Sequence, residues 1–121
     1  MSNVIHFEIC VDDLQEAVGF YSNVFGWKIE RADDSDYWFI TTGSDEDPGI
    51  TGGLMNRLDD WNPTVNTIEV QSVDSVAKRI TRAGGKVIAP KISIAGTGYV
   101  QYCQDLEGNI FGIMEFDESA E

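Results

Sequence analysis

An internal repeat is the feature that most constrains how this chain folds. Four apolar positions with helical spacing in the first half coincide with four in the second half when the sequence is shifted by 59 residues: Leu14, Ala17, Val18 and Tyr21 fall on Val73, Val76, Ala77 and Ile80. Each of these stretches follows a strand-like segment and precedes further ones. Repeat units of this size seldom close a core alone. The sequence therefore predicts a single α+β domain over residues 1–121, made of two βαβββ units at about 3–58 and 63–116.

The first segment shows the pattern most clearly. Residues 4–11 alternate between two faces, with Ile5 and Phe7 on the apolar one and His6, Glu8 and Cys10 on the other. Asp13 then offers an N-cap acceptor before Leu14, and Gly26 provides a left-handed exit after Phe25. The pattern predicts a strand over 4–11 and a helix from residue 14 to the glycine.

Strand and turn signals fill the rest of the chain. Strands are expected at 27–29, 37–40, 50–55, 64–70, 86–89, 99–104 and 110–116, with a second helix at 73–83. Residues 58–63 are typical of a linker, and 90–98 of a loop whose end forms a flexible lip. The acidic tail after Phe116 is expected to fray.

Charge and composition exclude several classes of function. The chain has 8 basic and 21 acidic residues and a net charge of −13, which disfavours nucleic acids and anionic membranes as partners. No apolar run approaches the roughly 20 residues that a membrane span needs, and no secretory signal pattern is present. Two cysteines do not make a disulfide framework. We expect a cytoplasmic protein.

Several motifs resemble those of the vicinal oxygen chelate superfamily, which includes glyoxalase I, bleomycin-resistance proteins and extradiol dioxygenases. The similar stretches lie in order along nearly the whole chain, at residues 6–9, 12–14, 20–21, 24–27, 83–87 and 105–112. The closest likeness is to the small glyoxalase-like branch. The resemblance implies two half-barrels that form a cup, and a homodimer. Within this block, Phe20, Tyr21 and Phe25 are expected to dock the first helix on a sheet.

The resemblance also implies positions for a divalent metal. Catalytic relatives take His, Glu or Gln ligands from the first strand and the later strands of each unit. Here those positions fall on His6, on Val65, near Gly53 and on Gly112. One ligand of four does not hold a catalytic metal, which needs about three protein ligands. We therefore expect no metal cofactor.

An altered ligand set is the alternative. Glu8 lies on the same strand face as His6, and the 59-residue shift aligns Glu69 with Cys10. His6, Glu8 and Glu69 would suit a divalent metal such as zinc, nickel, manganese or iron, or would serve as catalytic acid and base without one. The simpler interpretation leaves both carboxylates near the wet mouth of the cup, bonded to a tyrosine or to Thr67.

The remaining candidates would line a pocket. Gly52, Gly53 and Gly112 would widen the cavity or admit a ligand to the backbone. Side chains expected to form walls or contacts are Cys10, Trp38, Ile40, Met55, Thr67, Tyr102, Ile110 and Met114. Cys10 is also a potential nucleophile, although a packing role is favoured. Together these features predict binding of a small organic molecule. The alternative is a metal-dependent lyase, isomerase or dioxygenase, similar to lactoylglutathione lyase or to the dioxygenases.

Overall fold

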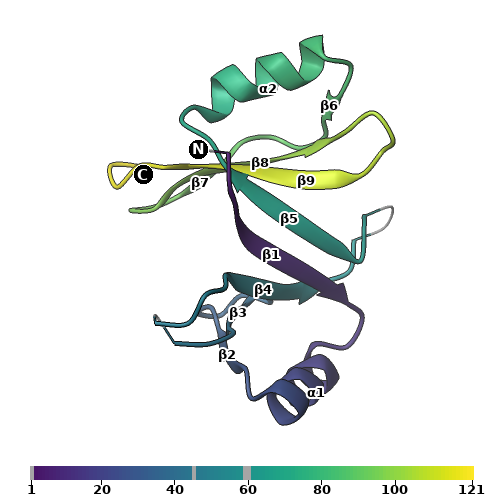
Figure 1. Ribbon diagram of the computed structural model, residues 1–121, viewed down its shortest axis with the longest axis vertical. Helices are drawn as coiled ribbons and strands as arrows, with labels where there is room; N and C mark the ends of the chain where they lie inside the picture. The colour runs from purple at the N-terminus through teal and green to yellow at the C-terminus, as the bar shows by residue number, and fades with distance from the viewer. Residues whose placement is uncertain (1, 45, 59–60) are drawn as a thin grey trace. The chain divides into compact units, whose positions relative to one another are not determined.

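The computed structural model describes residues 2–44, 46–58 and 61–121 (Figure 1). Asp59 and Asp60 of the predicted linker lie outside the described residues. The chain divides into two compact units: His6–Val65, and Asn66–Glu121 together with the first residues up to Ile5. The backbone N–H of Glu69 donates to the carbonyl of Asn3 at 2.9 Å. The chain's first residues therefore belong to the unit that its second half forms.

In the unit His6–Val65, four strands are hydrogen-bonded in the order β2-β3-β4-β1. The elements are β1 (Val4–Val11), α1 (Leu14–Phe25), β2 (Lys28–Arg31), β3 (Trp38–Thr41) and β4 (Thr51–Asn56). Strand β4 runs parallel to β1, and the other neighbours are antiparallel. The first strand and first helix have the bounds that alternation and capping predict.

Helix α1 begins and ends as its capping residues predict. Asp13 accepts a hydrogen bond from the backbone N–H of Glu16 at 3.0 Å, and Gly26 adopts a φ of 71°. The Tyr21 ring stacks on the Trp27 ring at 5.1 Å between centroids. Phe20 and Phe25 are 55% and 59% exposed, so neither is a buried anchor, but the Phe25 ring still packs on the Trp27 ring at 5.5 Å between centroids.

The second unit consists mainly of antiparallel strands. Its elements are β5 (Thr64–Glu69), whose first two residues belong to the other unit, α2 (Val73–Arg82), β6 (Lys86–Val87), β7 (Ile92–Ile94), β8 (Gly98–Gln104) and β9 (Ile110–Phe116). Strand β5 runs parallel to β9, while β9, β6 and β7 pair antiparallel with β8. Strand β7 forms where a loop is predicted, since its three residues pair with Gly98, Tyr99 and Val100.

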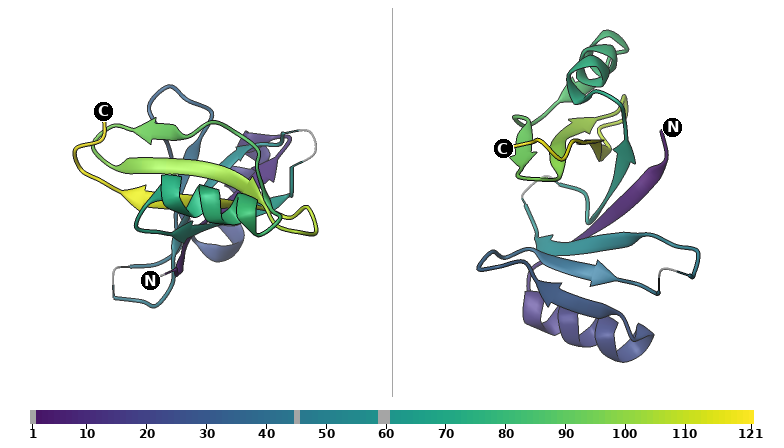
Figure 2. Two further views of the ribbon diagram at one scale, coloured as in Figure 1. Left: turned by 90° about the horizontal axis from the view of Figure 1, so that it is seen from above. Right: turned by 90° about the vertical axis from the view of Figure 1, so that its left-hand side faces the viewer.

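The core of this second unit lies beneath α2. Val73, Cys103 and Ile113 are fully or almost fully buried, and partly buried residues of the helix pack against them: Val76, Ala77 and Ile80. Figure 2 shows α2 lying across β8 and β9. The side of the sheet that faces α2 therefore forms the hydrophobic core of this unit.

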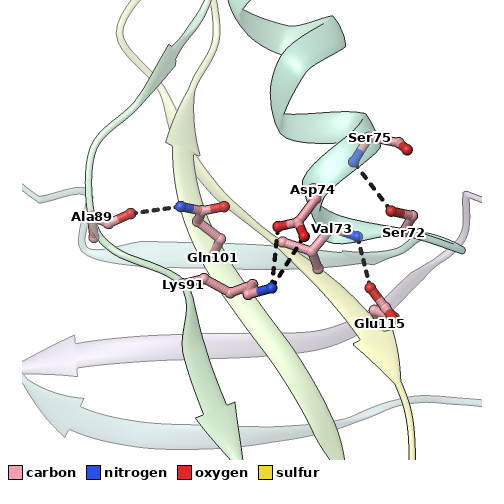
Figure 3. Close-up of polar contacts among 8 residues, drawn as sticks. All are labelled: Ser72, Val73, Asp74, Ser75, Ala89, Lys91, Gln101 and Glu115. Atoms are coloured by element: carbon pink, nitrogen blue, oxygen red, sulfur yellow. Dashed lines mark hydrogen bonds and ion pairs between the residues drawn. The ribbon is translucent and has the colours of Figure 1, made fainter.

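Three side chains contact the first turn of α2 and its N-cap region (Figure 3). Ser72 is the N-cap and accepts from the N–H of Ser75 at 3.1 Å. Glu115 of β9 accepts from the N–H of Val73 at 2.9 Å. Lys91 pairs with Asp74 at 3.2 Å. The Ser72 and Glu115 contacts satisfy backbone donors that a helix start leaves without partners.

The C-terminal segment is bound rather than frayed, so the expectation for the tail is wrong. The N–H of Asp117 donates to the carbonyl of Thr97 at 2.8 Å, and the N–H of Gly96 donates to the carbonyl of Ala120 at 2.9 Å. The Ala120 side chain is buried. Backbone pairing with the β7–β8 turn outweighs the mutual repulsion of an acidic sequence.

Both helices are short. Helix α1 has 12 residues and α2 has 10. Within the described residues, no helix is long and apolar enough to span a bilayer.

Candidate functional site

The functional residues predicted on the first strand share one side of the His6–Val65 sheet. Alternation along β1 puts His6, Glu8 and Cys10 on the same side, and register aligns them with Thr51, Gly53 and Met55 of β4. Phe39 of β3 aligns with Gly53 and therefore shares this side. We call it the His6 face. The opposite side carries Phe7, whose ring contacts Trp27 at 5.9 Å and thereby links the sheet to α1.

His6 is hydrogen-bonded to a residue that the sequence analysis did not select. Its Nε2 lies 2.7 Å from the hydroxyl oxygen of Tyr37. Burial lowers the pKa of His6 below its usual value of 6.5, and the nearby Glu8 carboxylate opposes that effect without overcoming it. The imidazole is therefore neutral at pH 7, and one of its two nitrogens can accept a hydrogen bond.

Gly53 leaves room for Tyr37 to reach His6. A Cβ atom at Gly53 would overlap the Tyr37 hydroxyl and ring, and one at Gly52 would overlap the ring of Phe7. The hypothesis that these glycines widen a cavity is therefore wrong, because neighbouring side chains fill the space. Each glycine instead lets an aromatic ring lie directly over strand β4.

The two other predicted residues of β1 are almost fully buried. Glu8 is 4% exposed and Cys10 is 2% exposed, so Glu8 does not lie at a wet mouth. Burial raises the pKa of the Cys10 thiol, and the Glu8 carboxylate raises it further. Since the thiolate is the nucleophilic form, this environment disfavours Cys10 as a nucleophile.

Strand register decides which aromatic residues share the His6 face. Trp38 aligns with Leu54 and Ile40 with Gly52, so both lie on the Phe7 side, away from His6. Trp38 instead lines a surface hollow of about 340 Å³ that also includes Arg31 and Asp36. Alternation outward from Phe39 would have indicated Tyr37, but only once the side facing His6 was known.

The candidates from the second half also share one side of their own sheet. Register aligns Thr67 with both Gly112 and, across β9, Tyr102, and it aligns Glu69 with Met114. This side is opposite to the core side that α2 covers. A Cβ atom at Gly112 would approach the Thr67 Oγ1 to 2.9 Å and the Tyr102 ring to 3.4 Å. Gly112 thus lets these two side chains approach each other.

The altered metal set stays a prediction. His6 and Glu8 belong to one unit and Glu69 to the other. Across residues 2–44, 46–58 and 61–121, no group of three or more His, Cys, Asp and Glu side chains is arranged to hold a metal ion.

Comparisons with known proteins agree with this fold. Residues 3–43 match the family model for bleomycin resistance protein-like N-terminal sequences. A glyoxalase/bleomycin resistance protein/dioxygenase superfamily member from Vibrio splendidus 12B01 is 15% identical, with a TM-score of 0.69, 97% of this chain covered and 100% of that one. Methylmalonyl-CoA epimerase from Mycobacterium tuberculosis is 17% identical, with a TM-score of 0.66 and coverages of 94% and 87%. A hypothetical protein from Bacillus halodurans C-125 is also 17% identical, with a TM-score of 0.66 and coverages of 99% and 98%.

These likenesses show the fold of the chain. The chain has the α+β fold of the glyoxalase, bleomycin-resistance and dioxygenase superfamily, so the resemblance drawn from the sequence motifs is confirmed. No curated protein sequence matches it. At 15–17% identity the structural likeness establishes the fold and leaves the activity to be argued from the site.

Proposed function

We propose that this protein binds a small organic molecule on the His6 face, through side chains and without a resident metal ion. The observation that carries the proposal is the hydrogen bond between His6 Nε2 and the Tyr37 hydroxyl, 2.7 Å long, beside the buried Glu8 carboxyl. Convergent polar groups within an otherwise apolar surface are typical of small-molecule sites.

The donor set at the inherited metal positions supports the metal-free form of the proposal. Gly53, Val65 and Gly112 have no side-chain ligand atoms. Tyr37 engages the Nε2 of His6 and fills the space beside Gly53. These residues do not fit the metal site that the fold family implies, because an open site needs about three protein ligands.

Charge indicates the kind of ligand. A net charge of −13 attracts cations, leaves neutral molecules unaffected and repels anions at long range. One structural neighbour is a methylmalonyl-CoA epimerase in complex with methylmalonyl-CoA, and coenzyme A esters are anionic. We therefore favour a cationic or neutral ligand here, and we do not transfer that substrate.

A matched set of aromatic probes tests the proposal. Benzylammonium, benzyl alcohol and benzoate share one ring and differ in charge. His6 is the only histidine of the chain, so its imidazole signal in an NMR titration needs no assignment. We expect saturable shifts of that signal, with the cation and the alcohol binding more tightly than benzoate, and weaker binding in Tyr37→Phe. Unchanged His6 signals with all three probes would overturn the proposal.

The adjacent imidazole and carboxyl favour a second candidate, a metal-dependent lyase, isomerase or dioxygenase. Glu8 is close enough to influence the pKa of His6. Both groups belong to the altered ligand set that the sequence predicts. Metal analysis of protein purified without chelator, beside His6→Ala, decides between the two candidates. Stoichiometric metal that is lost in the variant supports the enzyme and contradicts metal-free binding.

A further inference from the structure

The Tyr37 side chain occupies the space that a Cβ atom of residue 53 would take. Tyr37 precedes β3, and its ring lies over strand β4 at Gly53, which has no Cβ on the His6 face. The hydroxyl then meets His6 on the far side of β4, in strand β1. The neighbouring Gly52 lies under the ring of Phe7 on the opposite side of the sheet, whereas Gly43 and Gly19 have no aromatic ring within 4 Å. The glycine at 53 thus serves the contact between tyrosine and histidine.

We propose that Tyr37 is the positioning and specificity-determining residue of the His6 face. Residue 53 is glycine so that the Tyr37 hydroxyl can reach the Nε2 atom of His6 and form a hydrogen bond with it. This inference rests on the proposed function and refines it. With Nε2 engaged, His6 acts as a fixed, uncharged hydrogen-bonding group. A ligand then meets the tyrosine–histidine pair instead of a free imidazole.

Phe39 indicates what the rest of the ligand resembles. Its ring lies 5.5 Å from that of Tyr37, at an interplanar angle of 69°, and it is 53% exposed on the same face. An exposed aromatic ring beside a polar pair suits a molecule with an apolar or aromatic body and one polar group. A cationic group would gain from the ring face as well. The ligand class is therefore an amphipathic neutral molecule or cation.

A double-mutant cycle on ligand-free protein tests the dependence. The variants are Tyr37→Phe, Gly53→Ala and the double variant, and the readouts are the ¹⁵N shifts and the titration of the His6 imidazole. Removing the hydroxyl and displacing the ring both free Nε2 and admit water. We therefore expect both single variants to raise the apparent pKa of His6 and to change its tautomer balance. The double variant should resemble Tyr37→Phe, because both changes break one contact.

Gly19→Ala is the matched control. It adds the same methyl group in the same unit, at a glycine with nothing within 4 Å of the new atom, and should leave the His6 signals unchanged. Effects of Tyr37→Phe and Gly53→Ala that simply add, or a Gly53→Ala protein with wild-type His6 signals, would overturn the inference. If Gly53→Ala fails to fold, an unchanged His6 titration in Tyr37→Phe still overturns it, because that change adds no bulk.

The probes keep the two proposals distinguishable. If the cycle shows coupling but no probe binds, the arrangement of His6 stands and the proposed function fails. If probes shift His6 equally in wild type and Tyr37→Phe, binding stands and Tyr37 is not specificity-determining. An affinity for benzyl alcohol that falls about tenfold in Tyr37→Phe, the effect of about 1.4 kcal/mol, is the expected result.

Discussion

Glu115 reaches from β9 to the first turn of α2, where its Oε1 accepts a hydrogen bond from the backbone N–H of Val73 at 2.9 Å. Val73 is fully buried, so few other acceptors can replace this one. We expect Glu115→Ala to lower the free energy of unfolding by about 1–2 kcal/mol, as the loss of a helix cap does. Urea denaturation measures the effect, with the exposed Glu118→Ala as the control of equal charge change. Equal midpoints for the two variants would contradict the capping role.

The core beneath α2 gives a second expectation. Ile113 is 1% exposed, whereas Phe116 on the same strand is 56% exposed. Ile113→Ala should cost about 2–5 kcal/mol because it leaves a cavity, and Phe116→Ala should stay within about 0.5 kcal/mol. Thermal and urea unfolding of both variants check this contrast. A larger loss in Phe116→Ala would place the core on the wrong side of β9.

The lowered pKa of His6 predicts how stability depends on pH. The unfolded chain takes up the proton near pH 6.5, whereas the folded protein takes it up only at a lower pH. Stability from this residue is therefore complete above pH 6.5 and is lost as the pH falls below that value toward the folded pKa. The unfolding free energy of wild type and of His6→Gln is measured as a function of pH. Subtracting the values of the variant from those of wild type separates the contribution of His6 from that of the carboxylates. A difference that shrinks as the pH rises toward 6.5 would contradict the burial of His6.

Two glycines of the β7–β8 hairpin separate the cost of a left-handed backbone conformation from the cost of a steric overlap. Gly96 has a φ of 74° and open space where a Cβ would lie. Gly98 has a φ of 152°, and its Cβ would collide with the carbonyl oxygen of Glu115. Gly96→Ala should cost about 1–2 kcal/mol from the left-handed backbone alone, and Gly98→Ala clearly more. The melting temperatures of the two variants check this, and we expect the lower value for Gly98→Ala. A lower melting temperature for Gly96→Ala would refute the close approach of β8 and β9.

The bound tail predicts a change in hydrogen exchange. Ala120 is 5% exposed, and its carbonyl accepts from the N–H of Gly96. Ala120→Asp buries a charge there and should release the tail. We expect exchange of the Gly96 amide to accelerate about tenfold or more, as local opening becomes easier. Glu118→Ala should leave it unchanged, and an unaffected Gly96 in Ala120→Asp would show that the tail does not protect the turn.

Local signals predicted the elements that depend on local interactions. Strand β1 follows from alternation, and α1 from Asp13, Gly26 and the apolar spacing between them, all of which act within a few residues. Strand β7 is not predicted, because three residues are too few to show a clear alternation of apolar and polar side chains. Its formation depends on pairing with β8. The tail was misjudged for the same reason, since its partners are 20 or more residues away.

The site was predictable to a similar extent. His6 and Glu8 were selected because one strand fixes their common side. Tyr37 was missed and Trp38 was expected on the wrong side, because only the register between β3 and β4 tells which of two adjacent aromatic residues faces His6. The role of Gly53 required knowing which ring lies over it.

The hydrogen bond between Glu69 and Asn3 joins two segments that the ribosome synthesises at different times. During translation the amino-terminal residues leave the ribosome several seconds before the segment that they pair with, at usual elongation rates. They must remain unpaired during that time, or pair elsewhere. A gene cut at the repeat boundary would separate these residues from their partners, because the repeat units of the sequence and the compact units of the structure do not coincide.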